Sequence, residues 1–344
     1  MRLFEALVLG GLSIRNRVMM SPMSQRAAGE DGRARDWHLV HYGSRSVGGC
    51  GLVMVEDTAV TPLGRTGSAA LGLYDQEQAE QLRRIVFFCR SQGAAVGVQL
   101  AHAGRKALAD TRGARGTLAP TALAYGPEWA TPREATTADL GEVVDAFVAA
   151  AALALQAGFD VVEVHAAHGY LLHQFLSPLV NQRDDSYGRD SDGRRRLLIE
   201  VVTAVRESWP SERPLFVRLP ACDGASVGLQ AREVVECACA CAAAGATLVD
   251  LTGGTPLLGG ERVSPAQTWE TAAALRSGCE LPMALGGGIV DGADAQGLLD
   301  EHGAVLVSVG RPLLEDPYWS VKAARELDAL APLPANYVAA LQTS

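Results

Sequence analysis

The stretch VVEVHAAHGYLLHQF, residues 161–175, begins as a strand-length apolar run and carries His165, His168 and Tyr170 toward its end. Continuous runs of this kind are typical of strands that are buried on both faces, as in a parallel sheet. Two histidines three positions apart would point to opposite faces of a regular strand. The chain must therefore curl after His165, and Gly169 permits such a turn. The stretch predicts a buried parallel strand whose end presents polar side chains.

Seven further runs of the same kind occur along the chain. Together the eight predicted strands are 17–23, 51–60, 94–102, 161–168, 214–221, 247–254, 281–288 and 304–311. Amphipathic or alanine-rich segments follow them at 36–48, 77–92, 138–157, 193–208, 230–244, 266–277, 292–302 and 317–329. Eight strand–helix pairs predict an α/β protein of the (β/α)8 TIM barrel class. A doubly wound open sheet is the alternative, but no G-x-G-x-x-G motif follows the first strand to support it.

Two segments exceed a minimal barrel. Residues 1–15 precede the first strand and are expected to form a hairpin that closes the bottom of the barrel. Residues 103–137 form a long insertion after the third strand, rich in Gly, Pro and Arg, and we interpret it as a lid. Because no break in composition marks a boundary, residues 1–344 are expected to form one domain.

Composition excludes several classes of protein. The net charge of −9 argues against a nucleic acid or an anionic membrane as partner, since either would select a basic face. The N-terminus does not resemble a signal peptide, and no run approaches the roughly 20 apolar residues of a membrane span. We therefore expect a cytoplasmic protein with a small-molecule substrate. A homo-oligomer is compatible with the sequence, which does not determine the oligomeric state.

Seven cysteines raise the question of a metal site. Three of them lie in ECACACAAAGA, residues 236–246, but this segment lacks paired C-x-x-C spacing with a second ligand cluster. We expect free thiols that pack in the core and no bound metal.

In a (β/α)8 barrel the active site lies at the carboxyl ends of the strands, so the residues found there belong together. They are Ser21–Gln25, Glu56–Thr58, Gln99, His102, His165–Tyr170, Arg218, Gly253–Gly254, Gly286–Gly288 and Gly310–Arg311. The last two groups follow strands seven and eight, where barrels commonly hold a phosphate on glycine N–H groups and a helix N-terminus. The ends of the strands predict a site for an extended, phosphate-bearing ligand.

The chain resembles the Old Yellow Enzyme family of FMN-dependent ene-reductases, in particular its bacterial class related to xenobiotic reductases. The resemblance rests on NRVMMSPMSQ, DWHLVHYGSR, VGVQLAHAGRK, EVHAAHGYLLHQFLSPLVNQRDDSYG, LFVRLPA and VGRPLLEDP, which occur in this order along nearly the whole chain. It implies an FMN-binding barrel and a reduced nicotinamide, NADPH or NADH, as the source of hydride.

The resemblance also implies roles for individual residues. His165 and His168 would bind the carbonyl oxygen of the substrate, and Tyr170 would donate a proton. FMN would be held by Ser21, Pro22, Met23, Ser24, Asp57, Gln99, Arg218, Gly287, Gly288, Gly310 and Arg311.

Three positions depart from the pattern of the family. Ser24 stands where cysteine is frequent, Asp57 where a small residue is usual, and Arg26 where a tyrosine commonly contacts substrate. Arg26 is therefore expected to contact the substrate, and we expect it to form an ion pair with Asp57, because an unpaired carboxylate there would be costly to desolvate.

The implied activity is reduction of the activated C=C bond of an α,β-unsaturated carbonyl compound with NAD(P)H by a ping-pong mechanism. Two alternatives stay open. The same FMN barrel could serve a desaturase, an aromatising enzyme or an isomerase on a specialised metabolite. It could also be a flavin-binding protein without catalytic activity.

Overall fold

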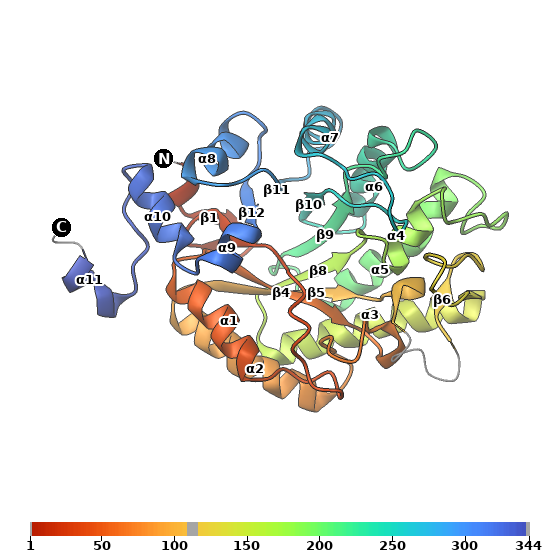
Figure 1. The fold of residues 1–344 in the computed structure, drawn as a ribbon, viewed down its shortest axis with the longest axis horizontal. Helices are drawn as coiled ribbons and strands as arrows, with labels where there is room; N and C mark the ends of the chain where they lie inside the picture. The colour runs from red at the N-terminus through yellow and green to blue at the C-terminus, as the bar shows by residue number, and fades with distance from the viewer. Residues whose placement is uncertain (1, 109–115, 342–344) are drawn as a thin grey trace.

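A computed structural model describes residues 2–108 and 116–341 of the chain. Its central feature is a closed barrel of eight strands, which neighbour one another in sequence order and pair in parallel (Figure 1). The strands are β3 (Val18–Met20), β4 (Leu52–Ala59), β5 (Ala95–Ala101), β8 (Val161–His165), β9 (Leu215–Pro220), β10 (Leu248–Thr252), β11 (Met283–Gly286) and β12 (Leu306–Val309). All eight lie within the predicted runs, which confirms the (β/α)8 barrel.

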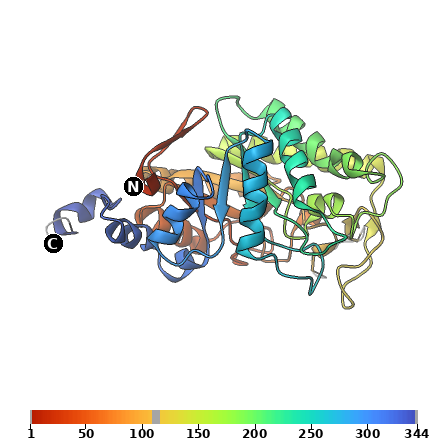
Figure 2. The same ribbon diagram turned by 90° about the horizontal axis from the view of Figure 1, so that it is seen from above.

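Eight helices surround the barrel, as predicted (Figure 2). They are α1 (Asp36–Val47), α2 (Gln76–Ser91), α3 (Thr137–Ala157), α5 (Ser191–Ser208), α6 (Ala231–Ala243), α7 (Pro265–Gly278), α8 (Gly292–Asp300) and α10 (Trp319–Glu326). The sequence did not predict four short helices: η1 (Arg2–Phe4), α4 (Leu171–Leu176), α9 (Arg311–Glu315) and α11 (Ala335–Leu341). A further short turn is η2 (Pro62–Gly64).

Helix α2 illustrates why these segments are helical. Its N-cap Asp75 accepts a hydrogen bond from Gln78 N at 2.8 Å, and Gln78 Oε1 accepts one in return from Asp75 N at 3.3 Å. Such a cap typically stabilises a helix by about 1 kcal/mol. The apolar residues that α2 buries against the barrel recur with helical spacing, at Leu82, Ile85, Val86 and Cys89.

The lower part of the barrel interior is apolar. Met19, Leu52, Val161 and Phe216 are among the buried side chains that fill it. The hairpin of β1 (Leu7–Leu9) and β2 (Leu12–Ile14) packs its Leu9 and Ile14 against this cluster. The apolar plug leaves the opposite end of the barrel for polar side chains, because side chains alternate between inside and outside along each strand.

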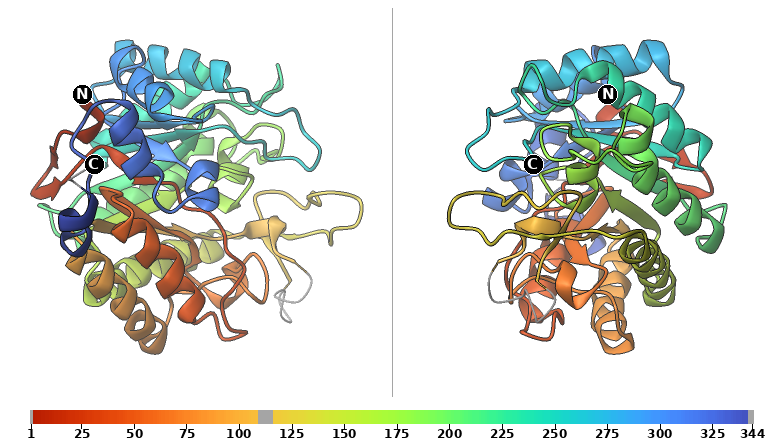
Figure 3. Two further views of the ribbon diagram at one scale, coloured as in Figure 1. Left: turned by 60° about the vertical axis from the view of Figure 1, so that its left-hand side comes forward. Right: turned by 90° about the vertical axis from the view of Figure 1, so that its right-hand side faces the viewer.

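The segment predicted as a lid extends from the polar end of the barrel. It contains η3 (Gly104–Lys106) and the short parallel pair β6 (Leu118–Ala119) and β7 (Arg133–Glu134), while residues 109–115 lie outside the described residues. In Figure 3 this segment and the loop after β10 project from the same end of the molecule. Arg105 links them, since its Nη2 donates to Pro256 O at 3.0 Å and its Nη1 to Leu123 O at 2.9 Å.

No helix in the described part of the chain is long and apolar enough to cross a membrane. All seven cysteines are free thiols, as expected.

Candidate active site

Strand register brings polar side chains from separate strands to one level inside the barrel. Gln99 on β5 is in register with Asp57 on β4 and with Glu163 on β8, and Arg218 on β9 is in register with Asp250 on β10. Gln99 Nε2 donates to Glu163 Oε1 at 2.7 Å. Arg218 Nε lies 3.2 Å from Asp250 Oδ2.

Sequence reasoning missed Glu163 and Asp250 in this network. The signal was present, because each is a charged residue inside an otherwise apolar strand run, at a position that faces inward. Burial raises the pKa of Glu163, and the charge of Asp250 raises it further. Burial also raises the pKa of Asp250, while Arg218 acts in the opposite direction. The network therefore favours a paired Asp250 and a protonated Glu163.

His165 and His168 lie side by side although they are three residues apart. The Ala167 N–H donates to His165 Nδ1 at 3.3 Å, so the ring proton of His165 is on Nε2. That nitrogen lies 3.2 Å from His168 Nδ1, and His168 Nε2 lies 3.2 Å from Thr252 Oγ1. Burial, followed by neighbouring positive charges, lowers the pKa of both histidines well below the ordinary value. They are neutral imidazoles near neutral pH.

A strained turn creates this arrangement, as the sequence predicted. His168 adopts a left-handed backbone conformation with φ 57°, which costs a residue with a Cβ about 1–2 kcal/mol, and Gly169 follows with φ 76°. Lys106 Nζ donates to His168 O at 2.6 Å, and the Gly169 N–H donates to His173 Nδ1 at 2.9 Å. His173 is fixed in turn by Asp223, with 2.8 Å between Nε2 and Oδ1. These bonds hold the turn that points both histidines into the barrel mouth.

Tyr170 is half-buried at the N-cap position of α4. Its ring lies edge-on to that of His165, with 5.0 Å between centroids. Lys106 Nζ lies 5.0 Å from the centroid of the same tyrosine ring. Burial raises the pKa of Tyr170 well above its ordinary value, so the phenol is protonated at neutral pH.

A cavity of about 350 Å³ opens over Tyr170, and we call it the mouth cavity. Its walls combine polar groups with aromatic rings, among them Ser24, Arg26, Lys106, Tyr125, Trp129 and Tyr170. Sequence reasoning missed Lys106 and Tyr125, which the insertion after β5 contributes. The mixture suits a small molecule with an apolar body and a few polar groups.

The predicted ion pair between Arg26 and Asp57 is wrong. Among the described residues, no carboxylate oxygen lies within 4.0 Å of the Arg26 guanidinium, and Arg26 is exposed at the rim of the mouth cavity. The buried Asp57 instead accepts a hydrogen bond from Ser24 Oγ. The loop after β3 reaches Asp57 with Ser24 and then turns away, since Arg26 has a left-handed φ of 51°.

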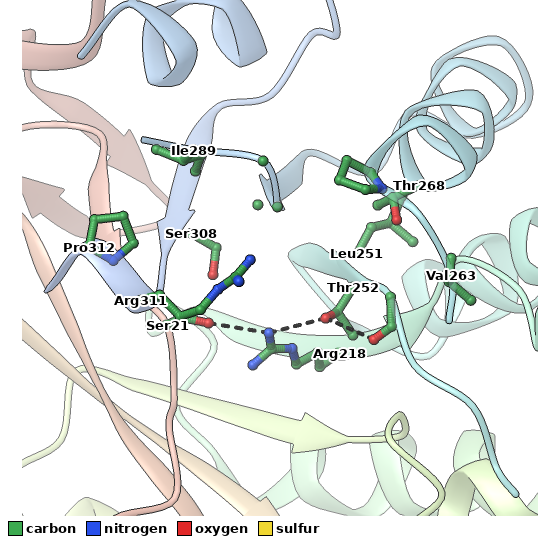
Figure 4. A pocket seen from close by; sticks show the side chains of 16 residues that line it. Ser21, Arg218, Leu251, Thr252, Val263, Thr268, Ile289, Ser308, Arg311 and Pro312 are labelled. Carbon is green, nitrogen blue, oxygen red and sulfur yellow. Dashed lines mark hydrogen bonds between the residues drawn. The ribbon is translucent and has the colours of Figure 1, made fainter. Parts of the chain in front are cut away.

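A second cavity, of about 290 Å³, lies at the ends of β11 and β12 (Figure 4). We call it the anchoring cavity; Gly286, Gly287, Gly288, Ser308, Gly310 and Arg311 form one side of it, and Ser21 and Arg218 another. Arg218 Nη2 donates to Ser21 Oγ and to Thr252 Oγ1, each at 3.3 Å.

The anchoring cavity has the features of a site for an anionic group. Gly287 and Gly288 have φ values of 90° and 74°, which other residues rarely adopt, and a Cβ on Gly286 would lie 2.4 Å from Ser308 O. Ser308 Oγ is buried without a hydrogen-bond partner among the described residues. Two guanidinium groups, those of Arg218 and Arg311, lie at the same cavity. Backbone N–H groups together with arginines are the donors that bind phosphate.

The remaining sequence-predicted residues lie between the two cavities. Pro22 and Met23 are half-buried in the loop after β3, and Met23 Sδ lies 3.6 Å from the place of a Cβ on Gly310. Gln99 is buried at the level of Asp57. The structure thus brings the predicted residues to one end of the barrel.

Comparison with known proteins agrees with this geometry. Residues 2–329 match the NADH:flavin oxidoreductase / NADH oxidase family. The chain is 40% identical over 326 residues to the NADPH dehydrogenase of a Geobacillus species, strain WCH70, with 94% of each chain covered. The structure superposes on morphinone reductase with a TM-score of 0.82 at 28% identity, covering 96% of this chain and 90% of that one. It also superposes on the old yellow enzyme homologue of Zymomonas mobilis with a TM-score of 0.81 at 23% identity, covering 96% and 94%.

Proposed function

Because the chain belongs to the NADH:flavin oxidoreductase / NADH oxidase family, that of Old Yellow Enzyme, and is an FMN-dependent NAD(P)H oxidoreductase, we propose that it reduces the activated C=C bond of α,β-unsaturated carbonyl compounds. When bound, FMN accepts a hydride from the nicotinamide and delivers one to a carbon atom of the substrate. The mouth cavity of about 350 Å³ suits one of these two ligands at a time, which supports a ping-pong order.

The anchoring cavity fits FMN. Its glycine backbone, the unpartnered Ser308 hydroxyl and Arg311 would hold the phosphate. Ser21, Pro22, Met23 and Ser24 would line the ring system, which Asp57 would meet through its backbone. Gln99 would bond the polar edge of the ring, and the positive charge of Arg218 would stabilise negative charge there.

One observation carries the proposal: two neutral histidine rings present nitrogens 3.2 Å apart, His165 Nε2 and His168 Nδ1. A carbonyl oxygen between them would accept hydrogen bonds from both. His165 already carries its proton on Nε2. His168 would take the Nδ1–H tautomer, with the Thr252 hydroxyl donating to its Nε2. Two such donors stabilise the negative charge that develops on the oxygen, and each is typically worth about 2.7–4 kcal/mol.

Tyr170 would supply the proton that completes the reduction. The phenol is protonated at neutral pH and lines the mouth cavity, with its ring against His165. A positioned acid of this kind contributes roughly 100- to 10,000-fold to the rate. Arg26, at the rim, would contact a polar group of the substrate.

The test separates the two half-reactions under anaerobic conditions. NADPH or NADH should bleach the bound flavin, and 2-cyclohexen-1-one should restore its colour. In Tyr170→Phe the second step should slow by about 100-fold or more. Equal losses in both steps would mean that Tyr170 only positions its surroundings. Bleaching without recovery by any enone would favour a desaturase, an aromatising enzyme or an isomerase. Absence of bleaching would favour a catalytically silent flavin protein.

A further inference from the structure

A buried carboxyl group, Asp57, lies behind Ser24 on the far side of the hydroxyl from the mouth cavity. Ser24 lines the cavity and is exposed, whereas Asp57 is 6% exposed and is not part of the cavity wall. The Ser24 hydroxyl hydrogen-bonds to Asp57 Oδ1. The serine is therefore the contact through which the buried carboxyl group communicates with the cavity.

The same serine hydroxyl is close to Tyr170. It lies near enough to stabilise the phenolate form of Tyr170 by hydrogen bonding, and both residues line the mouth cavity. A serine hydroxyl has one proton to donate and two lone pairs to accept with. It can accept from a protonated Asp57 and donate to Tyr170 at the same time, which gives a continuous path from the carboxyl group to the phenol.

The charged and titratable groups around Asp57 determine its protonation. Glu56 precedes it on β4, and the charges of both carboxylates act on Tyr42 of α1. Lys106 of η3 and Ser24 of the β3 loop favour the charged form, while burial and Glu56 oppose it. Together they raise the pKa of Asp57 to about 7. Arg26 and Tyr170 complete the surroundings, with Arg26 favouring the Tyr170 phenolate.

We propose that Asp57 and Ser24 form a proton relay that returns a proton to Tyr170 after each turnover. The proposal rests on the proposed function of Tyr170 as the proton donor and adds two catalytic residues to it. Neither residue follows from the general pattern of the family, which usually has a small residue at the position of Asp57.

The proton count closes over one turnover. The O–H bond of Tyr170 breaks as a C–H bond of the substrate forms, which leaves a phenolate. Ser24 Oγ gives its proton to the phenolate and takes one from the Asp57 carboxyl group. The Asp57 carboxylate then regains a proton from water through the exposed Ser24. No electron moves in these steps, and one solvent proton reaches the substrate.

The pH dependence of turnover tests the relay. Because the active form of Asp57 is the acid, kcat for enone reduction should be full below pH 6 and fall by about tenfold between pH 6 and 8, under conditions in which substrate reduction limits the rate. In Asp57→Asn, this pH-dependent step should vanish and kcat at pH 6 should fall by about tenfold or more. Glu163, whose pKa of about 8 lies in the same range, would keep its own contribution in this variant.

Further variants separate proton transfer from a structural role. Ser24→Ala should behave like Asp57→Asn, and Ser24→Thr, which keeps the hydroxyl, should recover most of the pH-dependent step. Glu56→Gln should move the step to lower pH, because it removes a negative charge that raises the pKa of Asp57. Asp145→Asn, a change at an exposed carboxylate on α3, should reproduce the wild-type profile.

An infrared titration of the holoenzyme without substrate gives a second readout. The wild type should show a carboxylic-acid C=O band that disappears near pH 7, and Asp57→Asn should lack it. A wild-type pH profile in folded, FMN-loaded Asp57→Asn, or a band unchanged in that variant, overturns the relay. Failure of the wild type to reduce any enone would instead contradict the proposed function, and the infrared band would then still decide whether Asp57 is the acid.

Discussion

The anchoring cavity and the mouth cavity lie at the same end of the barrel but are built differently. The anchoring cavity is formed largely by backbone, with Gly286, Gly287, Gly288 and Gly310 following two neighbouring strands. The mouth cavity is formed by side chains, and its partners come from β4, η3, the β3 loop and the start of α4. One cavity binds through groups that every residue has, and the other through specific pairs.

The difference shows in the titratable groups. In the mouth region, burial shifts the pKa values of His165, His168, Tyr170 and Asp57 away from their ordinary values. Groups with such shifts commonly cluster where proton transfer occurs. The comparison therefore assigns cofactor binding to the anchoring cavity and proton transfer to the mouth cavity, and substitutions on each side should separate the two properties.

The largest effect is expected when the histidine pair is removed. Replacing both His165 and His168 by alanine should lower kcat/KM for enone reduction by at least 100-fold, because the loss of one such donor typically costs about 2.7–4 kcal/mol. The charge-transfer absorbance that phenols induce in the oxidised holoenzyme should also disappear. FMN content, measured after heat release, should be mostly retained. Phenol binding at wild-type strength in this variant would contradict the assignment.

An intermediate effect is expected at Arg311, on the anchoring side. Arg311→Ala should weaken FMN binding by about tenfold to a hundredfold, since a hydrogen bond to a charged group contributes about 1.5–3 kcal/mol. Fluorescence of free FMN on dilution measures the affinity. The matched control is Arg325→Ala, which removes the same charge from the exposed face of α10. If Arg311→Ala kept its FMN and lost enone reduction instead, the division between the cavities would be wrong.

The smallest effect concerns Arg26. In a double-mutant cycle on the stability of the holoenzyme, Arg26→Ala and Asp57→Asn should be additive within about 0.3–0.5 kcal/mol, because no ion pair joins them. Ser24→Ala and Asp57→Asn should instead couple by about 0.5–3 kcal/mol, as residues in contact do. Denaturant unfolding measures both cycles. A coupling of Arg26 to Asp57 equal to that of Ser24 would restore the ion pair that the sequence suggested.

Much of the barrel could be predicted because its signals are local. Each strand appears as a short apolar run and each helix as an amphipathic segment, and both patterns depend on residues close in sequence. The proximity of His165, His168 and Tyr170 was equally accessible, since these residues are contiguous and Gly169 marks the turn between them. The glycines at the ends of β11 and β12 indicated a phosphate site because barrel strands end in order.

The partners of individual side chains required the tertiary structure. Asp57 is bonded to Ser24 and not to Arg26, and Lys106 contacts His168 across 62 positions of sequence. Gln99, Glu163, Arg218 and Asp250 meet only because four strands pair in a particular register. Residue types indicate which charges need partners, but loop conformation and strand register decide which groups come within hydrogen-bonding distance. A left-handed turn at one residue, such as Arg26, is enough to exchange one partner for another.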